Sequence, residues 1–367
     1  MLSYQHIYHA GNHADVLKHT TLVMLLEHLN VKQKPYTVID THAGSGRYGI
    51  NDKRALKTRD ADTGINRLLQ NVVCGDNAAV ASNAMYDDKA MCDRNPTLYN
   101  ATSCAAFAHY RDFVKACSVH GFYPGSPEIA RSFMRRYDNL ILCELHKAEV
   151  AALKQNMKLP LIALGRGKAV VENAITCGKT HTSRSDAGHM HGTTNAQIAC
   201  ATTNAVRGFV HVHCRDGFDA LTSLTPPKIK RGLVLVDPSY EDAHEYERVP
   251  SAFASLFARW SGAIFALWYP LLFHRRIECS AMKQKIIAQA KGSASGCNVV
   301  LGELCVNAEN AHKETGSELS ARAHLYGSGM LVVNAPWKLA ENMKAVLPYF
   351  AKTLGIDGCG SWSVDCF

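Results

Sequence analysis

The sequence predicts an α/β protein with a mostly parallel sheet of seven strands and an antiparallel strand at its edge. Short apolar runs alternate with helical patterns along the chain, as parallel strands and their crossover helices do. Several of the runs lack interspersed polar residues, which is typical of strands covered on both faces. The last two predicted strands are joined by a polar link without a clear helix, which predicts an antiparallel pair.

Length, charge and cysteine content limit the class of protein. The 367 residues carry a net charge of +8, compatible with a nucleic-acid partner or with an ordinary basic enzyme. The 13 cysteines include no CxxC pair and no signal peptide precedes them, so we expect reduced thiols in a cytoplasmic protein. No apolar run reaches the length of about 20 residues that spans a membrane.

The most informative stretch is Gly232–Glu241, GLVLVDPSYE. Its apolar part predicts a buried strand, and Asp237, Pro238, Ser239 and Tyr240 follow at the carboxyl end. Ligands of open α/β sheets bind outside the carboxyl ends of the strands. An acid, a rigid turn and an exposed aromatic ring are therefore expected at a binding site. The alternative is a strand that ends in an ordinary polar turn.

The N-terminal segment contains four histidines, His6, His9, His13 and His19. Asn12 suits the N-cap of a helix whose apolar residues keep helical spacing. We disfavour a metal site because no carboxylate or cysteine completes a ligand set. The expected arrangement is a capped helix with histidine and lysine on its polar face.

A second buried strand, Thr37–Ile39, ends at Asp40 and leads into the glycine-bearing turn A-G-S-G. Glycines let backbone N–H groups approach a ligand closely. The turn is not a complete G-x-G-x-x-G pattern, and it lacks the lysine of a phosphate-binding loop. Asp40 is placed to accept the ammonium group of a cofactor that carries an amino-acid end.

Two further strands, Asn139–Glu144 and Gly208–Gly217, also deliver acids at their carboxyl ends, Glu144 and Asp216. Together with Asp40 and Asp237, they predict a cationic, hydroxyl-rich ligand. S-adenosylmethionine has this chemistry, with an ammonium, two ribose hydroxyls, an adenine amine and a sulfonium. Glu144 suits the ribose, and Asp216 suits the adenine amine.

Two segments interrupt the pattern. We expect the main domain to comprise residues 1–50 and 118–367, with a partly helical subdomain inserted at 51–117 and a flexible insertion at about 160–207. Near their junction, Ser126 is expected to cap a helix with Pro127 at its first position. Arg131, Arg135 and Arg136 are expected on the solvated or phosphate-binding face of that helix.

The sequence resembles a known family at several places. Asp-Pro-x-aromatic after the fourth strand resembles the (D/N)-P-P-(Y/F/W) signature of amino-group methyltransferases, with Ser239 in place of the second proline. YQHIYHAGNHADVLKH, DTHAGSGRY, YPGSP, RDGF, LVDPSYE, ALWYP and GSGMLVVNAPWKL resemble the RlmJ family, bacterial enzymes that methylate N6 of one adenine in 23S ribosomal RNA. The resemblance implies a Rossmann-like class I methyltransferase that uses S-adenosylmethionine, acts on protein-free or early-assembly 23S rRNA, and is a monomer without a metal.

The resemblance also implies residue roles. The cofactor contacts would be His19, His42, Ser126, Glu144, Asp216 and Gly217, with Asp237 and a weaker candidate in Lys18, and Tyr4 would contact the RNA. In this interpretation Asp237 and the carbonyl of Pro238 accept the two amine hydrogens of the base, and Tyr240 stacks on it.

Three alternatives stay open. A nicotinamide- or nucleotide-dependent metabolic enzyme could use the same sheet, but Gly44 and Gly46 do not supply a complete dinucleotide pattern. A noncatalytic RNA-binding relative would have Ser239 as a first sign of decay. The chain could also be another adenine-N6 methyltransferase of nucleic acids.

Overall fold

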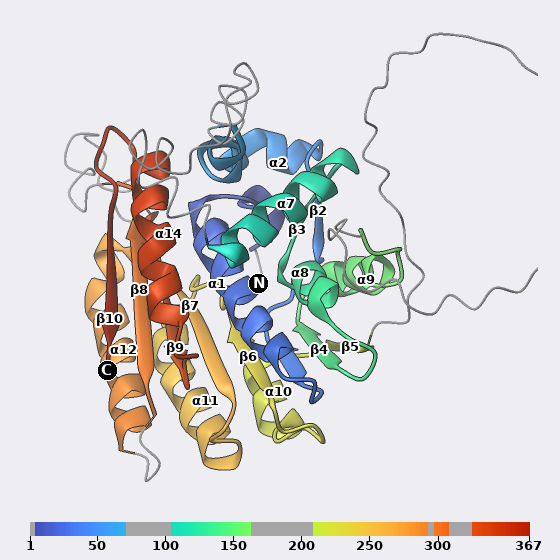
Figure 1. The fold of residues 1–367 in the computed structure, drawn as a ribbon, viewed down its shortest axis with the longest axis vertical. Coiled ribbons are helices and arrows are strands. Elements are labelled where there is room, and N and C mark those ends of the chain that lie inside the picture. Colours follow the sequence, from blue (N-terminus) through green and yellow to red (C-terminus); the bar gives the residue numbers. More distant parts are fainter. Residues whose placement is uncertain (1–3, 71–103, 163–207, 293–296, 308–324) are drawn as a thin grey trace, which may run out of the picture.

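The centre of the protein is a mixed β-sheet. The computed structural model describes residues 4–70, 104–162, 208–292, 297–307 and 325–367. Within them an eight-stranded sheet has the order β10-β8-β9-β7-β6-β1-β4-β5 (Figure 1). The strands are β1 (Thr37–Asp40), β4 (Asn139–Glu144), β5 (Phe209–Cys214), β6 (Gly232–Val236), β7 (Ile264–Leu272), β8 (Val299–Cys305), β9 (Leu325–Val333) and β10 (Ser361–Cys366).

The strand directions confirm the predicted fold class and refine its edge. Strands β5, β4, β1, β6 and β7 run parallel, and the expected antiparallel pairing of β8 with β9 is present. The antiparallel β9 lies between β7 and β8, so it is not the edge strand. The sheet has one strand more than expected, because β10 pairs antiparallel with β8 at the edge. Its sequence SWSVDC is half polar and mostly exposed, so it carries no buried apolar run.

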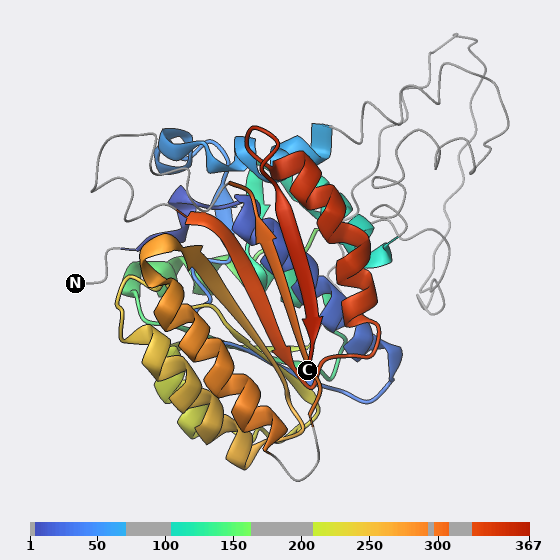
Figure 2. The ribbon, with the colours of Figure 1, turned by 90° about the vertical axis from the view of Figure 1, so that its left-hand side faces the viewer.

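Helices cover both faces of the sheet. One core joins the sheet to α1 (His13–Val31), α7 (Ala105–Val119), α8 (Ser126–Phe133), α9 (Lys147–Asn156) and α14 (Leu339–Leu354). The other core joins it to α10 (Gly217–Leu224), α11 (Glu245–Arg259) and α12 (Arg276–Lys291). Figure 2 shows α11 and α12 on one side of the strands and α14 on the other.

Helix α1 is buried on nearly all sides, so the expected polar face is wrong. It packs between α7, α8 and the sheet, and this places Lys18 and His19 in the interior at 4% and 1% exposure. The predicted N-cap is confirmed, because the Asn12 side chain accepts a hydrogen bond from the Asp15 N–H at 2.9 Å. A helix with buried cationic and imidazole groups must provide them with polar partners.

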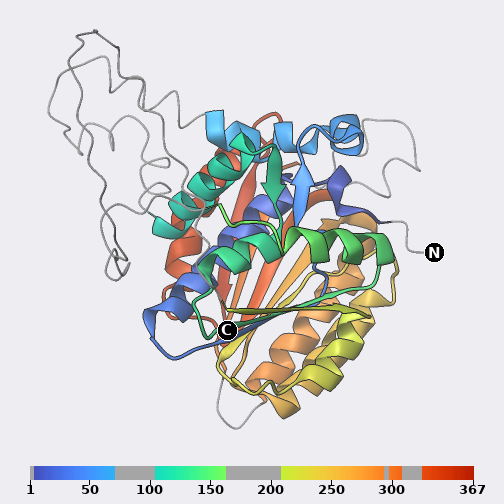
Figure 3. The same ribbon diagram turned by 90° about the vertical axis from the view of Figure 1, so that its right-hand side faces the viewer.

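The N-terminal segment packs against a small second sheet. Strands β2 (Arg47–Gly49) and β3 (Phe122–Pro124) pair antiparallel, beside η1 (His6–Tyr8), α2 (Lys53–Thr58) and α3 (Asp60–Thr63) (Figure 3). Within the predicted subdomain at 51–117, α7 contributes to the main core. Residues 71–103 of that subdomain and residues 163–207 of the predicted insertion lie outside the described ranges, and the division into domains stays a prediction.

The expected basic face of the helix after Pro124 is wrong in two of its three arginines. Arg131 is 6% exposed, forms an ion pair with Glu128 at 2.8 Å and donates to two backbone carbonyls. Arg135, beyond the helix, pairs with Asp138 at 3.0 Å. Arginine satisfies buried carboxylates well because its planar guanidinium donates several hydrogen bonds. Arg136 is exposed as predicted, but it also lies beyond the helix, which ends at Phe133.

Candidate functional site

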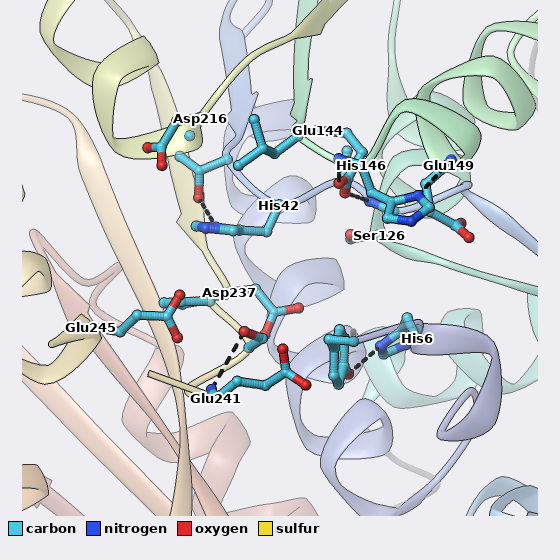
Figure 4. Close-up of a pocket in the computed structure, with 18 of the residues that line it drawn as sticks. His6, His42, Ser126, Glu144, His146, Glu149, Asp216, Asp237, Glu241 and Glu245 are labelled. Atoms are coloured by element: carbon cyan, nitrogen blue, oxygen red, sulfur yellow. Dashed lines mark hydrogen bonds between the residues drawn. The ribbon is translucent and has the colours of Figure 1, made fainter. Parts of the chain in front are cut away.

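A cavity of about 980 Å³ lies at the carboxyl ends of β1, β4 and β6 (Figure 4). Its volume lies within the usual range for ligand sites. Most of the predicted site residues line it: Tyr4, Lys18, His19, His42, Ser126, Glu144, Asp216, Gly217, Asp237 and Pro238. Asp40 and Tyr240 do not. Residues predicted from separate strands and helices therefore lie together around one cavity, and their roles stay predictions.

Glu144 is fixed by the glycine-bearing turn after β1. The Gly44 N–H donates to one carboxylate oxygen at 2.8 Å, and the His146 N–H donates to the other at 2.7 Å. Gly44 has φ +57°, and a Cβ there would collide with the hydroxyl of Tyr48. Only glycine adopts this conformation easily. The carboxylate keeps its remaining lone pairs for a ligand in the cavity.

Asp216 lies at the N-terminus of α10, on the same side of the cavity as Glu144 (Figure 4). Its Oδ1 accepts from the Phe218 N–H at 2.8 Å, and Arg248 donates to both oxygens at 3.1 Å. Partial burial would raise the pKa of Asp216, but the backbone N–H groups of the helix and Arg248 outweigh it and lower the pKa. The next residue is Gly217, and a side chain would not fit there because its Cβ would overlap the carbonyl of Thr41 at the end of β1.

Asp237 is held by a chain of buried charges that reaches the N-terminal segment. Lys18 Nζ donates to Asp237 Oδ2 at 2.6 Å and pairs with Asp15 Oδ1 at 2.9 Å. His6 Nε2 lies 3.0 Å from Asp15 Oδ2, and the Tyr4 hydroxyl lies 2.9 Å from His6 Nδ1. The chain connects the cavity rim at Tyr4 to the carboxylate at the end of β6.

The charges in this chain stabilise one another. Burial alone would lower the pKa of Lys18, yet the carboxylates of Asp15 and Asp237 hold it well above its usual range. Burial alone would raise the pKa of Asp15, yet His6, Lys18 and His19 hold it well below. Lys18 therefore remains an ammonium, and its charge favours the ionised form of Asp15.

The sequence did not predict that His6, Asp15 and Arg248 belong to the site. The Asp15–Lys18 pair has i,i+3 spacing, so their contact on one helix face was readable from the sequence. His6 and Arg248 gave no comparable signal. They reach their partners through tertiary packing across 9 and 32 residues of chain.

Two histidines of the cavity are neutral at pH 7. Burial lowers the pKa of His42 to about 4 and that of His19 to about 3. His42 Nδ1 lies 2.7 Å from the hydroxyl of Thr41, and His19 Nδ1 lies 2.8 Å from the hydroxyl of Tyr123. Neutral imidazoles offer hydrogen bonds without repelling a cationic ligand.

Asp40 supports the cavity from behind, which corrects its expected role as the direct acceptor of an ammonium group. It is 1% exposed, accepts from Ser126 Oγ at 2.7 Å and from the His42 N–H at 3.2 Å, and thereby fixes two lining residues. Ser126 does not cap α8 as predicted. Gly125 is the N-cap, and the Ser126 hydroxyl bonds Asp40 instead.

The protonation of Asp40 predicts pH-dependent ligand binding. Burial raises its pKa to about 7, the hydrogen bond from Ser126 opposes the rise and the nearby Asp237 adds to it. A cation in the cavity favours ionised Asp40, so binding should release a proton below pH 7. If the ligand is S-adenosylmethionine, as the sequence predicts, its affinity should rise from pH 5.5 to 7, by at most about tenfold per pH unit, in isothermal titration.

The matched control is Asp40→Asn, which keeps the shape and removes the titration. This variant should bind with nearly constant affinity over the same range, in which the ammonium of the ligand stays protonated. A wild-type affinity that does not change with pH would exclude coupling to Asp40.

Tyr240 is not exposed, which corrects the prediction made for it. The side chain is 6% exposed, its hydroxyl donates to the Trp268 carbonyl at 3.1 Å, and its ring packs 4.7 Å from that of Tyr246. Its φ of +55° lies in the left-handed region, unusual for a bulky residue. This conformation turns the ring into the core while Asp237, Pro238 and Ser239 line the cavity.

Neither a metal cluster nor a membrane helix is found in the described ranges. No group of three or more His, Cys, Asp or Glu side chains there is arranged to hold a metal ion. None of the described helices is long and apolar enough to cross a membrane.

The mostly parallel sheet and the acid-lined cavity at its strand ends are consistent with a Rossmann-like methyltransferase. A family model described as "Ribosomal RNA large subunit methyltransferase D, RlmJ" matches residues 101–162 and 199–367. The chain belongs to this family, as its N-terminal and strand-end motifs predicted.

Similar proteins agree with this assignment along the whole chain. Ribosomal RNA large subunit methyltransferase J of Haemophilus influenzae is 30% identical, and that of Escherichia coli K12 is 32% identical, each over 100% of this chain and 98% of the relative. A crystal structure of a Legionella pneumophila protein superposes with a TM-score of 0.66 at 25% identity, covering 97% of this chain and 98% of that one.

Proposed function

We propose that this protein transfers the methyl group of S-adenosylmethionine to the exocyclic N6 amine of one adenine in 23S ribosomal RNA. The observation that carries the proposal is the carboxylate of Asp237, held by the ammonium of Lys18 at the end of a central strand and facing the cavity. The family of the chain and the rRNA named in its two relatives support the substrate class. If the substrate is rRNA, we expect the enzyme to act in the cytoplasm on protein-free or early-assembly RNA. We also expect it to be a monomer.

The residues that line the cavity suit this cofactor. Glu144 offers carboxylate oxygens to ribose hydroxyls, and Asp216 offers them to an adenine amine. Glu241 and Glu245 add further negative charge to the wall near Asp237, which favours a ligand that carries ammonium and sulfonium groups (Figure 4). When bound, S-adenosylmethionine supplies a methyl group on a cationic sulfur.

The amine of adenine is a poor nucleophile because its lone pair is delocalised into the ring. Asp237 and the carbonyl of Pro238 would accept its two hydrogens and draw the nitrogen towards tetrahedral geometry, so that the lone pair becomes available. As the new N–C bond formed, the bond between the methyl group and the sulfur would break and leave a neutral thioether. The nitrogen would then release a proton, and Asp237 is the carboxylate proposed to take it. Such preorganised acceptors stabilise charge that develops in the transition state.

For RNA binding, we propose that Tyr4 stacks on the target adenine and that Tyr240 supports the turn that carries Asp237. Tyr4 is 36% exposed at the cavity rim, and its ring stacks on His9 with centroids 5.8 Å apart. An exposed ring can stack on an extruded base, which is worth about 1–3 kcal/mol. Tyr240 would have to leave its contacts with Tyr246 and Trp268 to do the same, so we assign it to holding the turn that carries Asp237.

The test is mass mapping of methylated adenines in 23S rRNA from cells with and without the gene. We expect one N6-methyladenine to disappear in the deletion strain and to return when the wild-type gene is supplied. Purified protein should then methylate transcribed 23S rRNA at the same adenine. Unchanged adenine methylation after deletion, or loss of a methyl group from a cytosine instead, would refute the proposal.

A further inference from the structure

A cluster of cations lies at the amino ends of the central strands, at the end of the sheet opposite the cavity. Three neighbouring strands, β4, β1 and β6, begin there, and each follows a turn that carries exposed positive charge. We call this cluster the basic edge, and it comprises Lys32, Lys34, Arg136, Lys228 and Lys230. Figure 1 shows the end of α1, the end of α8 and the loop after α10 together on the lower side of the ribbon.

Hydrogen bonds hold the three turns together. Arg135 donates to the carbonyls of Lys32 and Lys34 at 2.8 and 2.9 Å, and Arg231 donates to the carbonyl of Lys34 at 2.8 Å. Both guanidinium groups also lie over the ring of Tyr36, at 5.2 and 5.9 Å from its centroid. The frame is therefore built from hydrogen bonds between the turns and from contacts with the buried ring of Tyr36, and the lysines beside it are exposed.

The charge of the basic edge is not neutralised within the described residues. Asp138 is the one acid in the turns at 31–36, 134–138 and 225–231, and it is 1% exposed and paired with Arg135. The exposed lysines form no ion pair with a carboxylate in the described part of the chain. Partial burial lowers the pKa of Arg231, and the positive charge of Arg135 lowers it further. A surface of this kind attracts polyanions.

The opposite end of the sheet explains why such a surface is needed. The cavity is lined by Glu144, Glu149, Asp216, Glu241 and Glu245, which repel phosphate groups. An RNA substrate therefore needs positive charge elsewhere to hold its backbone. Strand β1 has four residues, about 13 Å at about 3.3 Å per residue, so one folded RNA can reach both ends of the sheet.

We propose that the basic edge binds the phosphate backbone of the RNA substrate at a second surface, remote from the base that is modified. Tyr137, 62% exposed with Arg136 over its ring at 5.4 Å, adds a stacking surface for an unpaired base there. The inference rests on the proposed rRNA substrate. Contacts of this kind position the nucleic acid without reading its sequence.

The test compares two double charge reversals. The test variant is Lys34→Glu with Lys230→Glu. The control is Lys285→Glu with Lys352→Glu, which changes the net charge equally at exposed positions on α12 and α14. Binding of transcribed 23S rRNA is measured by filter retention over a range of salt concentrations, and methyl transfer is measured with the same RNA. Thermal melting checks that both variants fold.

We expect the test variant to bind 23S rRNA about tenfold more weakly near 0.15 M salt. The slope of its log affinity against log salt concentration should be shallower, as expected from the loss of about two phosphate contacts. KM for RNA should rise by a similar factor while kcat stays unchanged, and the control should remain within about twofold of wild type. Equal losses in both variants, or none, would overturn the proposal. Loss of binding to phosphatidylserine vesicles with unchanged RNA binding would also overturn it, since the edge would then face lipid. A wild-type protein that binds RNA but methylates none would refute the proposed function and leave the basic edge standing.

Discussion

Replacing Asp237 with alanine should reduce methyl transfer to RNA by about 10³-fold or more, because the variant loses both the amine acceptor and the proton acceptor. Cofactor affinity should stay within a few-fold of wild type, since Glu144 and Asp216 lie at other strand ends. The variant should fold, because Lys18 keeps its ion pair with Asp15 at 2.9 Å. The measurements are transfer of a radiolabelled methyl group to 23S rRNA and isothermal titration of S-adenosylmethionine.

Asp242→Ala is the matched control, because it removes a carboxylate that lines the same cavity five residues further along and accepts from the His244 N–H at 2.9 Å. It should leave transfer near the wild-type rate. Asp237→Asn should lie near the alanine variant, since the amide cannot take the released proton. If Asp237→Ala transferred methyl groups as fast as the control, Asp237 would have no part in the chemistry.

The sequence predicted the sheet and the gathering of carboxylates at one end of it for a clear physical reason. An unbroken apolar run must be buried, and the residue that ends it lies at the carboxyl end of the strand, so the ends of β1, β4 and β6 could be found without coordinates. Strand β5 was found instead from the alternation of Val210, Val212 and Cys214 with polar residues. Glu144, Asp216 and Asp237 line one cavity as this argument predicts.

Prediction failed where burial depends on tertiary packing. The conformation of Tyr240, with φ +55°, follows from the pocket formed by Tyr246 and Trp268, which lie on other elements. Asp40 looked like its neighbours at the strand ends, yet Ser126 and His42 cover it. Strand β10 lacks an apolar run and pairs only at an exposed edge.

Replacing Lys18 with methionine should test whether the buried charge chain is one coupled unit. The side chain of Lys18 is 5% exposed between those of Asp15 and Asp237, at 1% and 12%. Methionine keeps most of the volume but leaves two carboxylates facing each other without the cation. Removing one partner of a buried ion pair costs about 3–5 kcal/mol, so the free energy of unfolding should fall by about that amount in urea titrations. Methyl transfer should fall as well, because Asp237 loses the group that orients it.

The double variant Lys18→Met with Asp237→Asn separates charge from packing. It removes the second carboxylate, while His6 still pairs with Asp15 at 3.0 Å. If the loss in Lys18→Met comes from unpaired charge, the double variant should recover much of the unfolding free energy and remain inactive. Additive losses would mean that the two residues act independently. Recovery of stability without recovery of transfer would show that the ion pair can be replaced without loss of stability, and that Lys18 and Asp237 are needed as a pair for methyl transfer.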